Sequence, residues 1–155
     1  MEKTVCFTGH REILGADYAS LKARLDAELD RLIADGAVCF RTGGALGFDT
    51  LAALCVLSKK QAHPHVRLHL VLPCPSQTQN WRKNDVLLYQ QILEKADSVR
   101  YISQTYFHGV LQLRNRALVD GADVCIAYLR TSSGGTAYTA SHAIRAGLEF
   151  INLAE

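Results

Sequence analysis

The sequence lacks long hydrophobic runs and has little excess of charge of either sign. No run approaches the length of a membrane span, and the apolar segment after Met1 is too short for a secretory signal. Seventeen basic and 15 acidic residues leave a net charge of +2, which excludes a strong global field that would attract nucleic acid, anionic lipid or acidic partners. Any anion site is therefore expected to be local, and no membrane partner is expected.

The five cysteines are odd in number and contain no C-x-x-C pair. This usage argues against a disulfide framework and fits thiols that are kept reduced in a cytoplasm. Cys6, Cys39 and Cys125 lie in apolar runs and are predicted to be small core residues. With only three prolines and 48% hydrophobic residues in 155, the composition predicts one domain over residues 1–155, without a linker, repeat or low-complexity tract.

Strands and helices are predicted to alternate along the chain. Short apolar runs predict strands at residues 3–8, 37–41, 67–72, 98–102, 124–128 and 150–153. Helices are predicted at 17–36, 48–60, from about 78 or later to 95, at 110–120, and from the turn at 132–136 to about 146. Asp17 can cap the first helix and Gly36 can end it. The pattern predicts a doubly wound α/β fold with a mostly parallel sheet covered by helices on both faces.

The second helix, at residues 48–60, is apolar on most of its faces and is expected to be well buried. A helix of this kind also favours association of the chain with a second copy, because its surface is too apolar to be left free. A homo-oligomer is therefore expected.

In sheets of this kind, ligands bind beyond the carboxyl ends of the strands. Three loops at these ends suit a phosphate, because they offer glycine amides, hydroxyls and helix N-termini. The candidate ligand-binding residues in them are Thr8, Gly9, His10, Arg11, Gly43, Gly44, Ala45, Gly47, Ser133, Gly134, Gly135 and Thr136. Glycines that merely permit tight turns are the alternative for each loop alone. Neither glycine loop matches the P-loop or dinucleotide fingerprint, which disfavours a triphosphate motor or an ordinary dehydrogenase.

Charged and aromatic residues near these loops are further candidates. His10 and Arg11 are two potential cations, of which Arg11 could hold a phosphate or could simply be solvated. Asp49 in the first turn of its helix is either a functional acid or a favourable charge at the helix dipole. Arg114 and Asn115 lie in a helix whose orientation decides whether they reach the site. Trp81 could stack on a base, although packing is the more frequent fate of such a residue.

A metal site is not expected. His63, His65 and His69 have no acidic or thiol ligand nearby in the sequence, and no cofactor is expected either.

Three segments together resemble the YpsA-like branch of the SLOG superfamily. They are Cys6-Phe7-Thr8-Gly9-His10-Arg11, Thr42-Gly43-Gly44-Ala45-Leu46-Gly47-Phe48-Asp49, and Leu113-Arg114-Asn115-Arg116-Ala117-Leu118-Val119-Asp120 leading to Ala122-Asp123. The resemblance spans nearly the whole chain and implies a Rossmann-like fold that binds a nucleotide or a nucleotide-derived ligand. It also implies distant similarity to the Smf/DprA proteins and to the LOG phosphoribohydrolases, which cleave the N-glycosidic bond of a nucleoside monophosphate.

The LOG resemblance is incomplete at the catalytic positions. Arg114 matches the LOG arginine, whereas Asn115 replaces the following lysine, and Gly134-Gly135-Thr136 resembles a shortened phosphate loop. Tyr138 and Thr139 stand where the relatives carry acids, so the LOG-type glutamate is absent. Asp49 or Asp120 would have to replace it, with Arg114 as the third candidate catalytic residue.

The leading hypothesis is therefore binding of a nucleotide-derived small molecule such as a nucleoside monophosphate or ADP-ribose. A LOG-like hydrolase is the first alternative, and DprA-like binding of single-stranded DNA is the second. Nucleic acid is not an expected partner, because the net charge is small and only one tryptophan is present to stack on bases.

Overall fold

The computed structural model describes residues 2–155 and contains one sheet of six strands. The strands are β1 (Lys3–Gly9), β2 (Ala37–Thr42), β3 (Arg67–Leu72), β4 (Ser98–Tyr101), β5 (Val124–Tyr128) and β6 (Glu149–Asn152). The helices are α1 (Tyr18–Ala34), α2 (Phe48–Ala62), α3 (Lys83–Lys95), α4 (Val110–Val119) and α5 (Gly135–Arg145). The strand order is β4-β3-β2-β1-β5-β6 and every neighbouring pair is parallel. The predicted α/β, Rossmann-like fold is confirmed.

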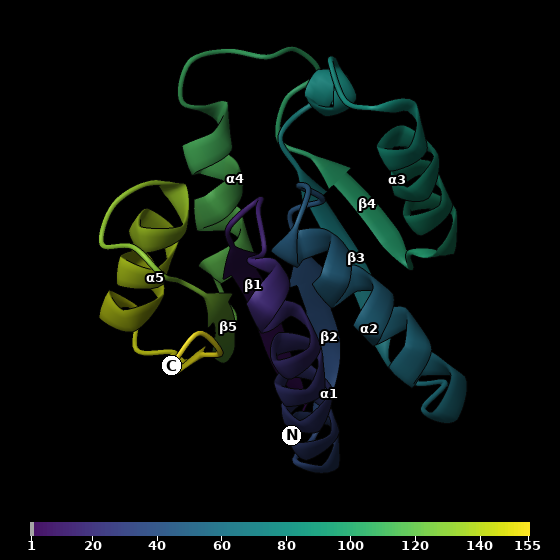
Figure 1. Ribbon diagram of the computed structural model, residues 1–155, viewed down its shortest axis with the longest axis vertical. Coiled ribbons are helices and arrows are strands. Elements are labelled where there is room, and N and C mark those ends of the chain that lie inside the picture. Colours follow the sequence, from purple (N-terminus) through teal and green to yellow (C-terminus); the bar gives the residue numbers. More distant parts are fainter. Residues whose placement is uncertain (1) are drawn as a thin grey trace.

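The helices form two groups, one on each face of the sheet (Figure 1). The first group consists of α1, α2 and α3, which contact one another in sequence, and the second consists of α4 and α5. Alternate side chains of β1 pack against the two groups of helices, because successive side chains of a strand point to opposite faces of the sheet. Val5 and Phe7 belong to the larger core under α1 and α2, whereas Cys6 belongs to the smaller core with Leu118 and Ala143.

Two of the three predicted core cysteines are fully buried. Cys6 and Cys125 have no exposed surface, whereas Cys39 is half-buried. All five cysteines carry free thiols in the structure. None of the helices within residues 2–155 is long and apolar enough to cross a membrane.

Helix α2 owes its apolar composition to packing within its own chain. Seven of its residues are buried: Phe48, Asp49, Leu51, Ala52, Ala53, Cys55 and Val56. Phe48 stacks on Tyr128 of β5 and packs edge-to-face on Phe7 of β1, which joins α2 to these two neighbouring strands. Helix α2 is therefore buried, as expected. Because its apolar residues pack within the same chain, its composition gives no support to the expected homo-oligomer.

Local contacts and backbone conformation determine how two of the helices begin. Asp17 occupies the N-cap of α1 but makes no side-chain cap hydrogen bond, because its carboxylate accepts from Tyr128 and Arg130 instead. Helix α3 begins only at Lys83, because Asn80 adopts a left-handed backbone with φ 73° and Arg82 is extended. Gly36 ends α1 with φ 99°, as predicted.

The direction of the chain reverses beside β1. From β1 the chain proceeds through β2 and β3 to the edge strand β4, and α4 then returns it to β5 on the other side of β1. In open α/β sheets, ligands bind at such a switch point, outside the carboxyl ends of the strands. The loops that follow β1, β2, β4 and β5 all reach this edge of the sheet (Figure 1).

The end of β1 is packed tightly against α2. A β-carbon at Gly9 would overlap the side chain of Phe48, and the Phe48 amide donates to the His10 carbonyl at 3.1 Å. Close packing at Gly9 therefore determines the direction in which the chain leaves β1 at the carboxyl edge of the sheet.

Replacing Gly9 with alanine is expected to lower the free energy of unfolding by about 1–3 kcal/mol, the usual cost of overpacking a dense core. Denaturant unfolding followed by circular dichroism measures this change. The matched control is Gly15→Ala, where no atom lies within 4 Å of the added carbon and a change within about 0.5 kcal/mol is expected. Equal stability of the two variants would contradict the role assigned to Gly9.

Candidate functional site

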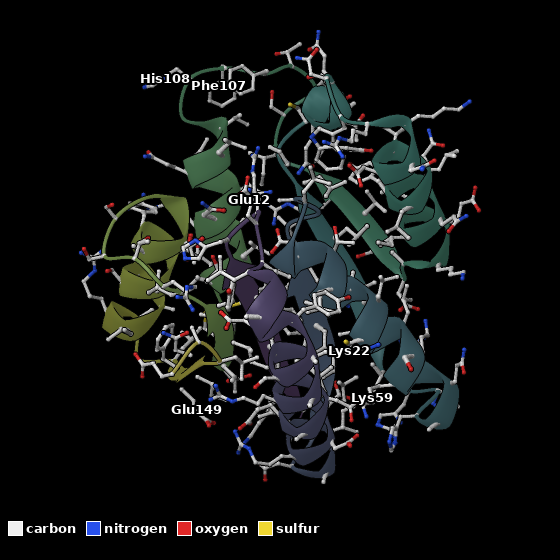
Figure 2. All side chains as sticks on the ribbon, in the orientation of Figure 1. Glu12, Lys22, Lys59, Phe107, His108 and Glu149 are labelled. Atoms are coloured by element: carbon white, nitrogen blue, oxygen red, sulfur yellow. The ribbon has the colours of Figure 1, made fainter. Side chains whose placement is uncertain are left out.

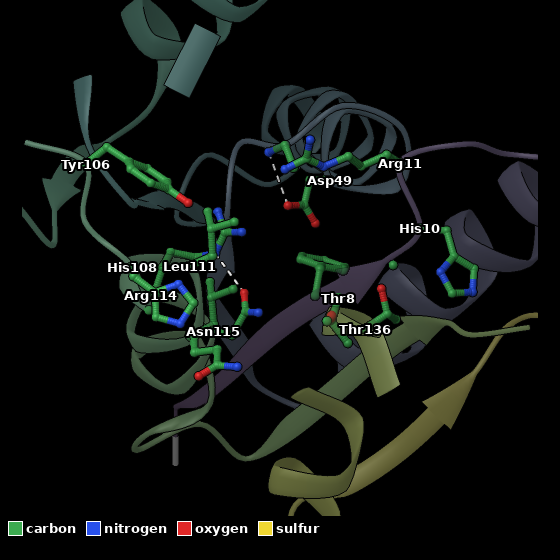
Figure 3. Close-up of a pocket in the computed structure, with 17 residues that line it drawn as sticks. Thr8, His10, Arg11, Asp49, Tyr106, His108, Leu111, Arg114, Asn115 and Thr136 are labelled. Carbon is green, nitrogen blue, oxygen red and sulfur yellow. Dashed lines mark hydrogen bonds between the residues drawn. The ribbon is translucent and has the colours of Figure 1, made fainter. Parts of the chain in front are cut away.

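A cavity of about 510 Å³ opens at the carboxyl edge of the sheet, at the switch point beside β1. Four segments line it: the end of β1 with the residues after it, the loop after β2 with the first turn of α2, the loop before α4 together with α4 itself, and the first turn of α5 (Figure 3). The predicted site residues among its lining are Thr8, Gly9, His10, Arg11, Ala45, Asp49, Arg114, Asn115, Gly135 and Thr136. The structure therefore brings together most of the predicted residues, from segments far apart in the sequence.

The glycine loop after β2 is held in place by hydrogen bonds to two buried side chains of the protein. The Ala45 amide donates to Oδ2 of Asp49 at 3.2 Å, and the Gly43 carbonyl accepts from Arg114 at 2.6 Å. A β-carbon at Gly43 would press on both Arg114 and Asp49. Gly43, Gly44 and Gly47 do not line the cavity, and only Ala45 of this loop does. These glycines permit close packing of the loop, which is the turn alternative, and the Ala45 amide is already occupied by a carboxylate.

Asp49 lies at the floor of the cavity with little exposed surface. Burial raises the pKa of its carboxyl group to about 6, although Arg114, the backbone amides of Ala45 and Gly43, and Arg11 all oppose the shift. While Oδ2 holds the loop, the other carboxylate oxygen points toward the centre of the cavity (Figure 3). Asp49 is the one carboxylic acid among the described residues that line the cavity.

Arg114 is buried on the inner face of α4, with only 6% of its surface exposed. Its Nη1 donates to the Gly43 carbonyl and its Nε donates to Oδ1 of Asn115 at 2.8 Å. No ion pair of the described residues includes Arg114. Burial lowers its pKa, with Asp49 opposing, but an arginine stays protonated in proteins. A buried positive charge without a direct counter-ion therefore faces the cavity.

Of the two potential cations after β1, only Arg11 provides a positive charge. The amide of Arg130 donates to Nε2 of His10 at 2.8 Å, so this nitrogen is an acceptor and the ring is neutral. Burial, together with the charge of Arg130, lowers the pKa of His10. Arg11 is exposed and makes no hydrogen bond or ion pair through its side chain in the described part of the chain.

The N-terminus of α5 opens onto the cavity through Gly135 and Thr136. Its N-cap residue, Gly134, has φ 97° and there is no side-chain cap hydrogen bond. The first amides of the helix are therefore free to bind an anion. Ser133 and Gly134 are exposed and do not line the cavity.

The structure adds residues of the loop between β4 and α4 that the sequence reasoning missed. Tyr106 and His108 line the mouth of the cavity, and Leu111 and Gln112 follow on α4. Tyr106 is 64% exposed, and its ring points toward the cavity (Figure 3). Figure 2 shows Phe107 and His108 at the upper edge of the molecule, Glu12 nearer the middle of the view, and Glu149 toward the lower end. Adjacent aromatic residues in a loop after a strand were the signal that could have identified this segment.

Besides Gly43, Gly44, Gly47, Ser133 and Gly134, two further predicted residues do not line the cavity. Asp120 is at the C-terminal end of α4, where its side chain is 72% exposed and lies 3.3 Å from His142. The ten residues of α4 span about 15 Å, which separates Asp120 from the mouth of the cavity. Trp81 packs edge-to-face on Tyr89, with ring centres 5.4 Å apart, and does not line the cavity. Packing is therefore the role that the structure gives to Trp81.

Within residues 2–155, no group of three or more histidine, cysteine, aspartate or glutamate side chains is placed to hold a metal ion.

Two solved structures share the fold of this chain. DNA processing protein A from Helicobacter pylori, described for its single-stranded DNA binding mode, superposes with a TM-score of 0.65 and 22% identity, covering 96% of this chain and 63% of that one. DNA processing protein A from Streptococcus pneumoniae gives a TM-score of 0.57 and 15% identity, covering 98% and 59%. At these identities the similarity shows the fold alone.

Curated relatives are similar over much of the chain. A UPF0398 protein of Halalkalibacterium halodurans is 32% identical over 76% of this chain and 64% of its own length. The uncharacterized SPbeta prophage-derived protein YoqJ of Bacillus subtilis is 29% identical over 75% of each chain. The aligned region thus spans about two thirds to three quarters of these relatives. A family model, YpsA of the SLOG proteins, matches residues 6–148. Because this match covers nearly the whole chain, the protein belongs to the YpsA SLOG family.

Proposed function

We propose that this protein binds a nucleotide or a nucleotide-derived anion in the cavity beside β1. The observation that carries the proposal is the buried Arg114, whose charge has no direct counter-ion among the described residues and faces the cavity. A buried charge is stabilised by a bound ion of opposite sign. The cavity volume of about 510 Å³ also lies in the range of about 300–1,000 Å³ that is usual for small-molecule sites.

The phosphate is assigned to the first turn of α5, next to Arg11. The free amides at Gly135 and Thr136 and the positive end of the helix dipole favour an anion at this position. Arg11 is exposed and its side chain makes no hydrogen bond or ion pair in the described chain, so it can turn onto the phosphate at the cost only of its electrostatic attraction to Asp49. This assignment replaces the loop at Gly43–Gly47, whose Ala45 amide is bound to Asp49.

The base is assigned to the mouth of the cavity, next to Tyr106. An exposed tyrosine offers an aromatic face on which a base can stack. Leu111 supplies an apolar surface on the same side. A nucleoside monophosphate or ADP-ribose has the required combination of phosphate, sugar and flat base.

Replacing Arg11 with alanine is expected to weaken binding of AMP about tenfold or more, because a charge-assisted hydrogen bond contributes about 1.5–3 kcal/mol. Isothermal titration calorimetry with AMP measures the dissociation constant. The control is Arg82→Ala, which removes an exposed arginine that does not line the cavity.

Equal affinities of the Arg11→Ala and Arg82→Ala variants would reject the phosphate position. Absence of binding by the unmodified protein to AMP, ADP-ribose and a wider nucleotide panel would reject the proposed function. Binding of a single-stranded oligonucleotide in preference to these small ligands would favour the activity described for the Helicobacter pylori protein.

A second candidate function, hydrolysis of an N-glycosidic bond, is favoured by the placement of Asp49. Its carboxyl pKa of about 6 suits transfer of a proton near neutral pH. With AMP the reaction would consume water and yield adenine and ribose 5-phosphate.

Replacing Asp49 with asparagine is expected to lower the rate of such a reaction about 10²–10⁴-fold, because the general base would be lost. Chromatography of free adenine after incubation with AMP measures the rate. Asp120→Asn is the matched control, since Asp120 lies outside the cavity. No adenine from the unmodified protein would remove this candidate and leave the binding proposal intact.

A further inference from the structure

Asp49 differs from the other charged groups at the cavity in the sign of its charge. Arg11 and Arg114 attract a phosphate, whereas a carboxylate at the floor repels one. The floor beside Asp49 therefore suits a part of the ligand that is uncharged and donates hydrogen bonds. In a nucleotide, the sugar hydroxyls and the base edge are the groups of this kind.

The hydrogen bond from Ala45 limits which of these groups Asp49 can hold. Oδ2 already accepts from the Ala45 amide, so the other oxygen is the one left without a hydrogen-bond donor in the described chain (Figure 3). Paired donors on the edge of guanine would have to share Oδ2 with the Ala45 amide, whereas a ribose hydroxyl needs only the other oxygen. Carboxylates also hold ribose hydroxyls in other Rossmann-like folds.

The position of Asp49 also fits the sugar. It lies on the floor near Thr8, while Gly135 and Thr136 lie at the open end of α5 and Tyr106 lies at the mouth (Figure 3). The sugar is the part of a nucleotide that connects the phosphate to the base. With the phosphate at α5 and the base at Tyr106, the sugar passes over the floor.

We propose that Asp49 accepts a hydrogen bond from the 2′-hydroxyl of the bound ligand, so that the cavity selects ribonucleotides over 2′-deoxyribonucleotides. This inference rests on the proposed nucleotide-binding function. Loss of the 2′-hydroxyl leaves the buried carboxylate without its donor, which is more costly than loss of a solvated contact. The selectivity is independent of the base, because Asp49 contacts the sugar only.

The test compares the affinities of AMP and 2′-dAMP, and of GMP and 2′-dGMP, for the full chain at pH 7.5. Both ribonucleotides are expected to bind about tenfold or more tightly than their deoxy counterparts, since hydrogen bonds to charged groups are strong. Asp49→Asn is expected to bring each pair close to equal affinity. Its one oxygen stays with the Ala45 amide, so an uncharged NH2 group that cannot accept from the 2′-hydroxyl faces the ligand. Asp120→Asn, the same change at an exposed site, is expected to keep the full ratio.

A pH series on the unmodified protein provides a second readout that does not depend on how well Asp49→Asn folds. Lowering the pH through the Asp49 pKa of about 6 neutralises the acceptor, so the ratio is expected to fall toward one. The other charged or titratable groups that line the cavity around Asp49 are Arg11, Arg114, His10, Tyr106 and His108. Their charges and the phosphate act on both ligands of a pair, so their effects cancel in the ratio.

The outcomes separate this inference from the proposed function. Equal binding of ribo- and deoxyribonucleotides by the unmodified protein would overturn the inference and leave nucleotide binding in place. A preference that is unchanged in Asp49→Asn or across the pH series would overturn it as well. A preference seen with one base only would reassign Asp49 to the base edge. No binding of any nucleotide would reject the proposed function itself.

Discussion

The floor of the cavity depends on two hydrogen bonds to the loop after β2, one from Arg114 to the Gly43 carbonyl and one from the Ala45 amide to Asp49. Arg114 belongs to α4 and Asp49 belongs to α2, so the two bonds join helices from opposite faces of the sheet. They are possible only because Gly43 has no side chain, since a β-carbon there would press on both charged groups. The glycine thus allows two buried charges to approach one loop, and this approach shapes the site.

The two charges at the floor give the cavity a mixed character. Arg114 is buried without a direct ion pair, and Asp49 is buried with a raised pKa, so neither charge fully neutralises the other. Separated opposite charges favour a ligand that carries both an anionic group and hydrogen-bond donors. A nucleotide meets this description, whereas a simple phosphate leaves Asp49 without a donor. The small net charge of the chain is consistent with such a local arrangement.

The fold and most of the cavity could be predicted from the sequence, but the hydrogen-bond partners could not. The spacing of apolar residues determines the strands and helices, and parallel strands bring their carboxyl ends together, which places Thr8, Asp49 and Thr136 at one edge. Which donor meets which acceptor depends on side-chain orientation. From the sequence His10 is a potential cation, whereas in the structure the Arg130 amide makes it a neutral acceptor. The sequence likewise offers Asp17 as a cap for α1, whereas its carboxylate accepts from Tyr128.

The position at which LOG relatives carry a catalytic acid bears on the choice between binding and hydrolysis. Tyr138 and Thr139 stand where the resemblance places the acids, and Thr139 is buried with its hydroxyl donating to the Gly135 carbonyl at 2.9 Å within α5. Most glycosidases use two carboxylates, one on each side of the bond that breaks. Among the described lining residues Asp49 is the one acid, and one of its two oxygens already accepts a hydrogen bond from the loop. Holding a ribose requires only the other oxygen of Asp49 and no proton transfer. The residues at the floor of the cavity are therefore sufficient for binding, whereas hydrolysis of the usual kind would need a second carboxylate.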